Sequence, residues 1–152
     1  MKLIVGGDHA GYELKAKVVE ALKSWGHEVV DIGTHSREPV DFPDIAEALC
    51  MDVRNDKAER GIMVCGTGVG AAIAANKMAG IRAALCHDVY SAHQSVEHDD
   101  VNVLCLGAWI VGEKLALELL QTFLAATHSA DVDFRRRVAK LGELEKRNAG
   151  ND

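Results

Sequence analysis

The chain lacks long apolar runs, an excess of positive charge and closely spaced cysteines. Each absence argues against one class of protein. No apolar run approaches the roughly 18 residues of a membrane-spanning helix. The net charge of −6 argues against non-specific binding to nucleic acid, because phosphates would be repelled outside the one basic patch, Arg135-Arg136-Arg137. The four cysteines contain no C-x-x-C pair, which predicts reduced thiols in a cytoplasmic protein rather than a disulfide framework. Met1 leads directly into an expected strand, so no signal peptide is expected.

Metal-binding patterns are missing as well. The chain has no H-E-x-x-H motif, and its cysteine spacing does not fit a zinc site. His93 and His98 stand five residues apart, on different faces of an expected helix. We therefore expect no metal site.

Short apolar strands alternate with amphipathic helices along the chain. In the first helix, Leu14, Val18 and Leu22 share one face, and Gly26 stands where a helix ends. Five strands separated by helices predict an α/β fold: a single-domain, Rossmann-like, doubly wound parallel five-stranded sheet with a C-terminal helix. One domain is expected over residues 1–152, with a frayed tail at 148–152. The expected strands are 3–6, 28–32, 61–65, 81–86 and 102–106, and the expected helices are 12–25, 43–55, 70–78, 89–98, 113–126 and 133–147.

Four polar loops follow the expected strands. Ligands of such sheets bind beyond the carboxyl ends of the strands. This rule gathers the loops at Asp8-His9, Cys65-Gly-Thr-Gly68, His87-Asp88 and Gly107 around one crevice. Polar loops are common at strand ends, but a thiol, histidines and a glycine-rich turn together indicate a functional site.

Cys65 ends a strand, directly before the glycines of the turn 66–70 and an alanine-rich helix. Unpaired N–H groups and the positive end of a helix dipole favour an anion at such a place. A thiol there is predicted to have a pKa lowered from about 8.5 into the range of roughly 3.5–7.5, which makes it a base or nucleophile at neutral pH. The alternative is a core cysteine next to a tight turn.

The same turn allows a second interpretation. Gly66-Thr-Gly-Val-Gly-Ala71 satisfies a relaxed G-x-G-x-x-A pattern, and Asp88 lies about the right distance beyond it to hold a ribose. Against dinucleotide binding, the motif follows the third expected strand, and Cys65 would crowd a pyrophosphate.

Two further features each have two interpretations. His98 at a helix end can offset the helix dipole, or serve as an acid–base group that opens a sugar ring. Arg135, Arg136 and Arg137 can form a solvated helix face, or supply a guanidinium to a phosphate.

Several motifs occur together over roughly residues 1–126: Gly7-Asp-His-Ala-Gly11, Asp31-Ile-Gly-Thr34, Asp41-Phe-Pro43, Cys65-Gly-Thr-Gly-Val-Gly70, Ala75-Asn-Lys77, Gly80-Ile-Arg-Ala83, Tyr90-Ser-Ala92, Asn102-Val-Leu104 and Val111-Gly112. In this order they resemble the ribose-5-phosphate isomerase B family, which also includes the galactose-6-phosphate isomerase subunits. The resemblance implies a cofactor-independent aldose–ketose isomerase of the pentose phosphate pathway. It also implies a homodimer, sometimes paired into a dimer of dimers, with active sites at the subunit interface.

The resemblance assigns roles to particular residues. Cys65 would carry the proton between C1 and C2 of the open-chain sugar, with Thr67 beside it, and His98 would help to open the furanose ring. The expected substrate-binding residues are Asp8, His9, Gly66, Gly68, Val69, Gly70, Asp99 and Arg137, the last reaching phosphate from the other subunit. An enediolate mechanism needs one mobile base and fixed donors for the developing oxyanion, and these residues would supply both without metal.

The chain departs from the family pattern near the phosphate. Asp99 and Phe42 stand where the family commonly has asparagine and tyrosine, and Trp109 replaces an arginine. Asp131-Val-Asp133-Phe134 replaces a Gly-Gly-Arg-His segment, so Arg135 or Arg136 would have to compensate for lost phosphate contacts.

Three hypotheses follow. The first is isomerisation of ribose 5-phosphate and ribulose 5-phosphate. The second is the same chemistry on a hexose 6-phosphate, a tetrose 4-phosphate or an unphosphorylated sugar. The third is a non-catalytic subunit that binds a nucleotide or sugar.

Overall fold

The computed structural model of the protein describes residues 1–149. Five parallel strands form one sheet in the order β2-β1-β3-β5-β4. They are β1 (Lys2–Gly7), β2 (Glu28–Asp31), β3 (Arg60–Cys65), β4 (Ala83–Leu85) and β5 (Val103–Gly107). The central strands β1, β3 and β5 are nearly continuous buried runs, because helices cover both faces of a parallel sheet. The predicted doubly wound α/β fold is confirmed.

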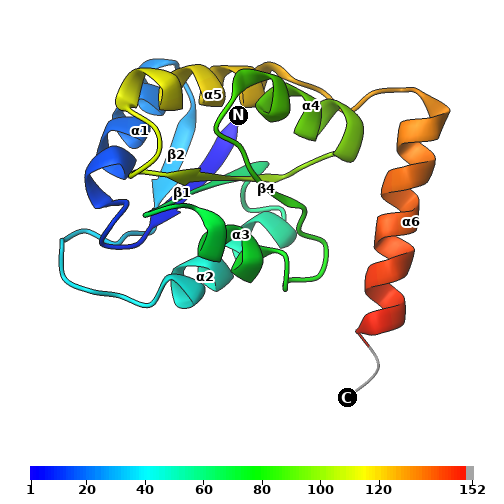
Figure 1. Cartoon of the computed structure of the whole chain (residues 1–152), viewed down its shortest axis with the longest axis horizontal. Coiled ribbons are helices and arrows are strands. Elements are labelled where there is room, and N and C mark those ends of the chain that lie inside the picture. The colour runs from blue at the N-terminus through cyan, green and yellow to red at the C-terminus, as the bar shows by residue number, and fades with distance from the viewer. Residues whose placement is uncertain (150–152) are drawn as a thin grey trace.

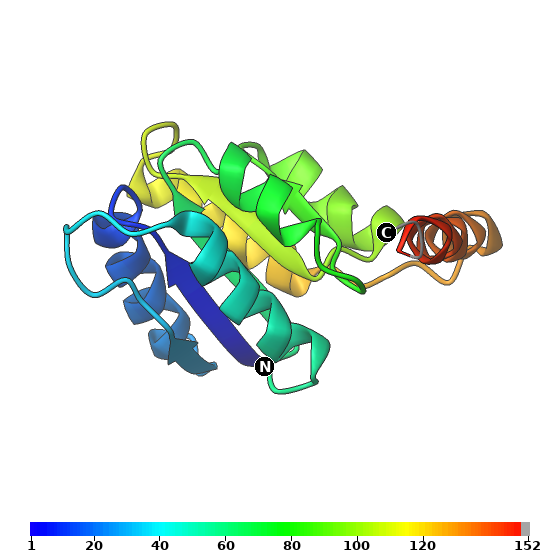
Figure 2. The same ribbon diagram turned by 90° about the horizontal axis from the view of Figure 1, so that it is seen from below.

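Helices pack on both faces of the sheet (Figure 1). On one face lie α1 (Tyr12–Ser24), α4 (Val89–Asp99) and α5 (Glu113–Ala125), and on the other α2 (Phe42–Arg54) and α3 (Val69–Ala75). Neighbouring strand residues point to opposite faces, so Leu3 belongs to the first core and Ile4 to the second. Figure 2, seen from below, shows α2 and α3 in front of the strands. Within residues 1–149, no helix is both long and apolar enough to cross a membrane.

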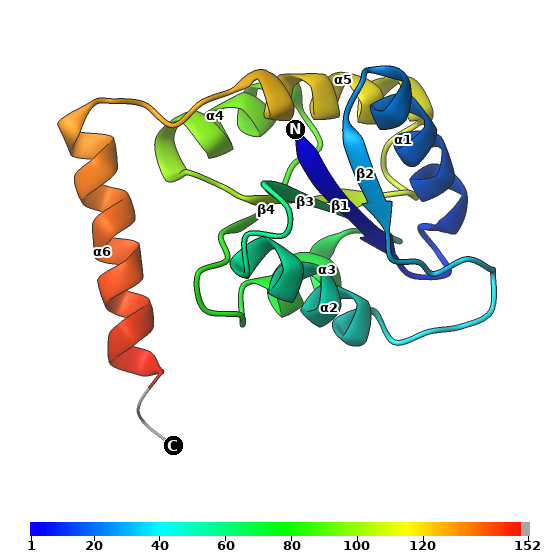
Figure 3. The same cartoon turned by 180° about the vertical axis from the view of Figure 1, so that it is seen from behind.

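The last helix, α6 (Val132–Asn148), stands apart from these layers, as Figures 1 and 3 show. It packs against α4, and none of its described residues is buried. Near its end, the Glu145 carboxylate accepts the N–H of Gly80 at 3.0 and 3.1 Å. The expected frayed tail begins at Asn148, the last residue of α6; residues 150–152 lie outside the described residues.

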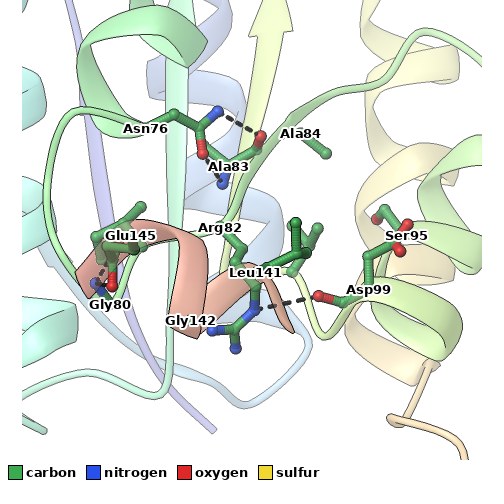
Figure 4. A pocket seen from close by; sticks show the side chains of 12 residues that line it. Asn76, Gly80, Arg82, Ala83, Ala84, Ser95, Asp99, Leu141, Gly142 and Glu145 are labelled. Atoms are coloured by element: carbon green, nitrogen blue, oxygen red, sulfur yellow. Dashed lines mark hydrogen bonds between the residues drawn. The ribbon is translucent and has the colours of Figure 1, made fainter. Parts of the chain in front are cut away.

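Both α3 and β4 are shorter than predicted, and side-chain amides are the reason (Figure 4). The Asn76 amide donates to the carbonyl oxygen of Ala83 and accepts its N–H, both at 2.9 Å. The Asn102 oxygen accepts the N–H of Arg82 at 2.9 Å. Gly80 turns the chain between them with a φ of 81°. Side chains therefore bind the N–H groups of Arg82 and Ala83, while the Arg82 carbonyl accepts the N–H of Asn102 at 3.0 Å, and β4 begins only at Ala83.

Candidate active site

Adjacent strands end together at the carboxyl edge of the sheet and form the centre of the site. β1 and β5 flank β3, and the strand register places Cys65 opposite Gly107. Gly11 allows the turn after β1 to lie directly on the end of β3, since a Cβ there would stand 2.0 Å from the carbonyl oxygen of Val64. This close approach brings Asp8 to Cys65.

Asp8 and Cys65 form a buried thiol–carboxylate pair. The Cys65 thiol donates to Oδ2 of Asp8 across 2.9 Å. The other carboxylate oxygen, Oδ1, accepts the N–H of Gly11 at 3.0 Å. Asp8 is only 5% exposed and Cys65 only 8%, so the two groups are largely shielded from bulk water.

The predicted low pKa of Cys65 is wrong for this arrangement. Burial, together with the hydrogen bond and the negative charge of Asp8, raises the pKa of the thiol to about 11. The N–H groups of Gly66 and Gly68 act in the predicted direction and lower the pKa, but they are outweighed. The resting site thus holds a neutral thiol next to a carboxylate, and a base arises only if the proton leaves sulfur.

The glycine turn after Cys65 lies beneath two aromatic side chains. A Cβ on Gly66 would stand 2.8 Å from the Trp109 ring, and one on Gly70 would stand 2.7 Å from the Phe42 ring. The backbone also ties these segments, because the Trp109 N–H donates to the carbonyl oxygen of Gly66 at 2.9 Å. The glycines of the relaxed dinucleotide motif are therefore in contact with protein side chains, which removes the close backbone approach that a pyrophosphate requires.

Asp88 has a structural role that also weakens the dinucleotide interpretation. Its side chain is the N-cap of α4 and accepts the N–H of Ser91 at 2.7 Å. This hydrogen bond lowers the pKa of Asp88. Its neighbour His87 accepts the N–H of Gly107 through Nε2 at 3.0 Å, so it holds the end of β5.

Further predicted residues surround the thiol. Thr67 is exposed, and its hydroxyl accepts the N–H of Val69 at 3.3 Å. His9 is exposed, and its Nδ1 accepts the N–H of Val40 at 3.3 Å. Together with Trp109, His9 lines a groove of about 540 Å³ beside the crevice.

The structure does not bring His98 to this crevice within one chain. His98 lies in the last turn of α4, shortly before β5 begins at Val103, whereas Cys65 pairs with the last residue of β5. The four residue steps of β5 alone span about 13 Å. Asp99, beside it, lines a cavity of about 360 Å³ between α6 and the sheet (Figure 4). The predicted site is therefore split into two parts.

The arginine cluster lies in the second part, in the first turns of α6. Arg135 donates through Nε to the carbonyl oxygen of Ser129 at 3.1 Å, and Arg136 pairs with Asp133 at 2.5 Å. Arg137 lies over the ring of Phe134. Among residues 1–149, no three His, Cys, Asp or Glu side chains cluster as metal ligands.

Sequence reasoning missed a buried ion pair beneath the crevice. The Lys15 ammonium contacts both carboxylate oxygens of Asp31, at 2.5 and 2.7 Å, and its side chain is 2% exposed. Asp31 also accepts the N–H of Gly33 at 2.9 Å, and the Gly33 carbonyl accepts the N–H of Gly7 at 2.7 Å. The pair thus supports the end of β1, directly before Asp8. The helical pattern gave no signal for it, because a lysine at this position reads as solvent-facing.

The fold and the crevice define an α/β protein with an acid–base site at the carboxyl edge of its sheet. Comparison with known proteins identifies the family. The model of the ribose/galactose isomerase family matches residues 3–141. The chain belongs to this family.

Individual relatives agree with the family. Ribose-5-phosphate isomerase B of Escherichia coli is 41% identical over 146 residues, which cover 96% of this chain and 97% of the relative. The structure of Clostridium thermocellum ribose-5-phosphate isomerase B is similar with a TM-score of 0.95 and 46% identity, and the match covers 97% and 99% of the two chains. The 4-deoxy-4-sulfo-D-erythrose isomerase of a Clostridium species is 35% identical over 147 residues, or 96% and 92% of the two chains.

Proposed function

We propose that the protein is a cofactor-independent aldose–ketose isomerase that interconverts ribose 5-phosphate and ribulose 5-phosphate. The observation that carries the proposal is the buried Cys65–Asp8 pair at the carboxyl edge of the sheet, in a chain with a relative named ribose-5-phosphate isomerase B. Four buried, unpaired cysteines support a reducing, cytoplasmic location.

In this mechanism Asp8 supplies the basicity and Cys65 carries the proton. The thiol passes its proton to Asp8 as the sulfur takes the proton from C2 of the open-chain aldose. The C–H electron pair becomes the C1=C2 bond of the enediolate, and the negative charge moves to O1. The sulfur then protonates C1 and recovers its proton from Asp8, while the 2-hydroxyl proton moves to O1 and leaves the C2 ketone. The amides at Gly66 and Gly68, together with Thr67, lie where they could stabilise the anionic intermediate.

A second subunit would complete the site. His98 and Arg137 lie away from Cys65 in the same chain, so we propose a homodimer, alone or paired into a dimer of dimers, in which each chain gives these side chains to its partner's crevice. Large apolar side chains at the carboxyl edge support an interface there: Ile73, Leu85, Val89, Tyr90 and Ile110 are all at least 37% exposed. An isologous interface on this edge would create two equal composite sites.

The choice of sugar depends on the side chains near the expected phosphate site. The Trp109 ring packs against Gly66. Phe134, in the first turn of α6, stands where the family pattern has a histidine. Phosphate binding would then depend on Arg137, with Arg135 or Arg136 in support. A relative named for a four-carbon sulfonate sugar makes a shorter substrate with a different anion the second candidate.

A substrate panel tests the function. We expect the highest kcat/KM with ribose 5-phosphate among pentose, hexose and tetrose phosphates and unphosphorylated sugars. A clear preference for a tetrose phosphate or sulfonate would support the second candidate. Calorimetric titration with NAD and NADP tests the non-catalytic alternative, which requires a dinucleotide signal without turnover.

The role of the thiol has its own test. Cys65→Ala should abolish exchange of the substrate C2 proton with solvent while the circular dichroism spectrum stays native. Undiminished exchange in a folded Cys65→Ala protein would exclude Cys65 as the proton carrier.

A further inference from the structure

Phe134, in the first turn of α6, contacts both functional groups that lie outside the crevice. Its ring stacks on the His98 imidazole with centroids 3.8 Å apart and planes inclined by 16°. The guanidinium carbon of Arg137 lies 5.5 Å from the centroid of the same ring. Aromatic stacking and cation–π contact both favour a fixed relative placement of the groups. One side chain therefore sets the positions of His98 and Arg137 together.

The segment that carries Phe134 is tied to α4 next to His98. The Ser129 N–H donates to the carbonyl oxygen of Glu97 at 2.9 Å. The Asp131 side chain caps α6 by accepting the N–H of Asp133 at 2.8 Å. Residues 129–135 therefore form a hydrogen-bonded segment, here called the root of α6. This segment holds the Phe134 ring against the end of α4.

Stacking leaves the edge of the His98 ring available. Among the described residues, neither ring nitrogen of His98 makes a hydrogen bond within the chain, and Nε2 lies 3.8 Å from the Glu97 carboxylate. A histidine that opens a sugar ring must present a ring nitrogen to the ring oxygen or to the anomeric hydroxyl. The face contact with Phe134 fixes the plane of the imidazole without occupying its nitrogens.

We propose that Phe134 is the positioning residue for ring opening: it orients His98 toward the cyclic sugar phosphate in the partner's crevice and holds Arg137 beside it. The inference rests on the isomerase function proposed above. It assigns Phe134 to the ring-opening step, which only the cyclic aldose requires. Proton transfer between C1 and C2 depends on Cys65 and Asp8, so Phe134 has no part in that step.

The test separates ring opening from proton transfer. Ribulose 5-phosphate has no furanose form, because its 5-hydroxyl is phosphorylated, so exchange of its C1 proton in D2O needs no ring opening. In the full-length Phe134→Leu protein, kcat for conversion of ribose 5-phosphate should fall about 10-fold, the upper end of what one aromatic pair supplies. At saturating ribulose 5-phosphate, exchange followed by proton NMR should stay within about twofold of wild type, since this chemistry does not use the stack.

Matched variants make the result specific to the aromatic face. Phe134→Tyr keeps the aromatic ring and should convert ribose 5-phosphate at close to the wild-type rate. Val132→Ala, at a 72% exposed position in the same turn, should change neither the conversion rate nor the exchange rate. The His98 ring protons should move downfield in Phe134→Leu, because the ring current of the stacked phenyl group is lost.

The outcomes are distinguishable. Unchanged conversion by Phe134→Leu, or an equal fall of conversion and exchange, overturns the inference while the isomerase proposal stands. A change confined to KM for both sugars assigns Phe134 to Arg137 alone and also overturns it. If the wild-type protein performs neither reaction, the proposed function itself fails, and the inference fails with it.

Discussion

The crevice at the carboxyl edge and the surface around the end of α4 and the root of α6 are built in different ways. Asp8 and Cys65 are almost completely buried, and the glycine turn beside them is packed under aromatic rings. By contrast, α6 has no buried residue among those described, and His98 is held by one stacked ring. The first region is rigid because the core fixes it. The second presents His98 at the end of α4 and the arginines of α6, where the proposed partner subunit would receive them.

The largest effect is expected from the rigid region. In Asp8→Asn the thiol loses its proton acceptor, so kcat should fall by about 10³-fold, within the range of a positioned acid–base group. KM should change little, and exchange of the C2 proton in D2O should fall in parallel with kcat. Asp56→Asn is the control, because Asp56 is exposed with a positive φ of 56° that asparagine tolerates. Full exchange activity in Asp8→Asn would show that the carboxylate does not accept the thiol proton.

Mixed dimers test whether the two regions cooperate across subunits. Cys65→Ala and His98→Ala chains carrying different tags can be co-expressed and the mixed dimer purified on both tags. One composite site of the two would then be intact, so activity should return to about half of the wild-type value. Each parent dimer should remain nearly inactive with ribose 5-phosphate. A mixed dimer as inactive as its parents would place Cys65 and His98 in the site of one chain.

The fold was predictable because its signals are local and repeated. Strands of the central sheet are continuous apolar runs, and helices such as Tyr12–Ser24 show a one-sided apolar pattern. The boundaries at Ala75 and Ala83 were not predictable, since they depend on Asn76 and Asn102 pairing with distant backbone groups. Hydrogen bonds between residues far apart in sequence leave no periodic pattern.

The contact between Asp8 and Cys65 was predictable from the strand ends, but the pKa of the thiol was not. Strand-end positions correctly gathered Asp8, Cys65 and the glycine turn. The predicted direction of the Cys65 pKa shift was wrong because the sequence shows the amides after the thiol but not the burial of the thiol or the carboxylate against the sulfur. The placement of His98 depends on the direction of α4 and on Phe134, and neither follows from residue spacing.

A smaller effect is expected from the ion pair under the crevice. Lys15→Met leaves the Asp31 carboxylate without its buried cation, and the free energy of unfolding should fall by about 3 kcal/mol, since Asp31 keeps part of its contact with water. Lys17, two residues further along α1, forms an ion pair with Glu113 at 2.6 Å whose side chains are 54% and 47% exposed. Lys17→Met should therefore leave urea unfolding unchanged. Equal effects of both variants would mean that Lys15 does not act through burial.

The smallest effect on global stability is expected in the exposed helix α6. Glu145→Ala removes the carboxylate that receives the Gly80 N–H, a contact on the surface. Because α6 contributes no buried residue to either core, the free energy of unfolding should change by less than about 1 kcal/mol. Hydrogen exchange of α6 amides should nevertheless accelerate, while amides of β3 and β5 keep their protection, since local opening is independent of global unfolding. A global loss as large as that of Lys15→Met would mean that α6 belongs to the same cooperative unit as the crevice, and the contrast between the two regions would no longer hold.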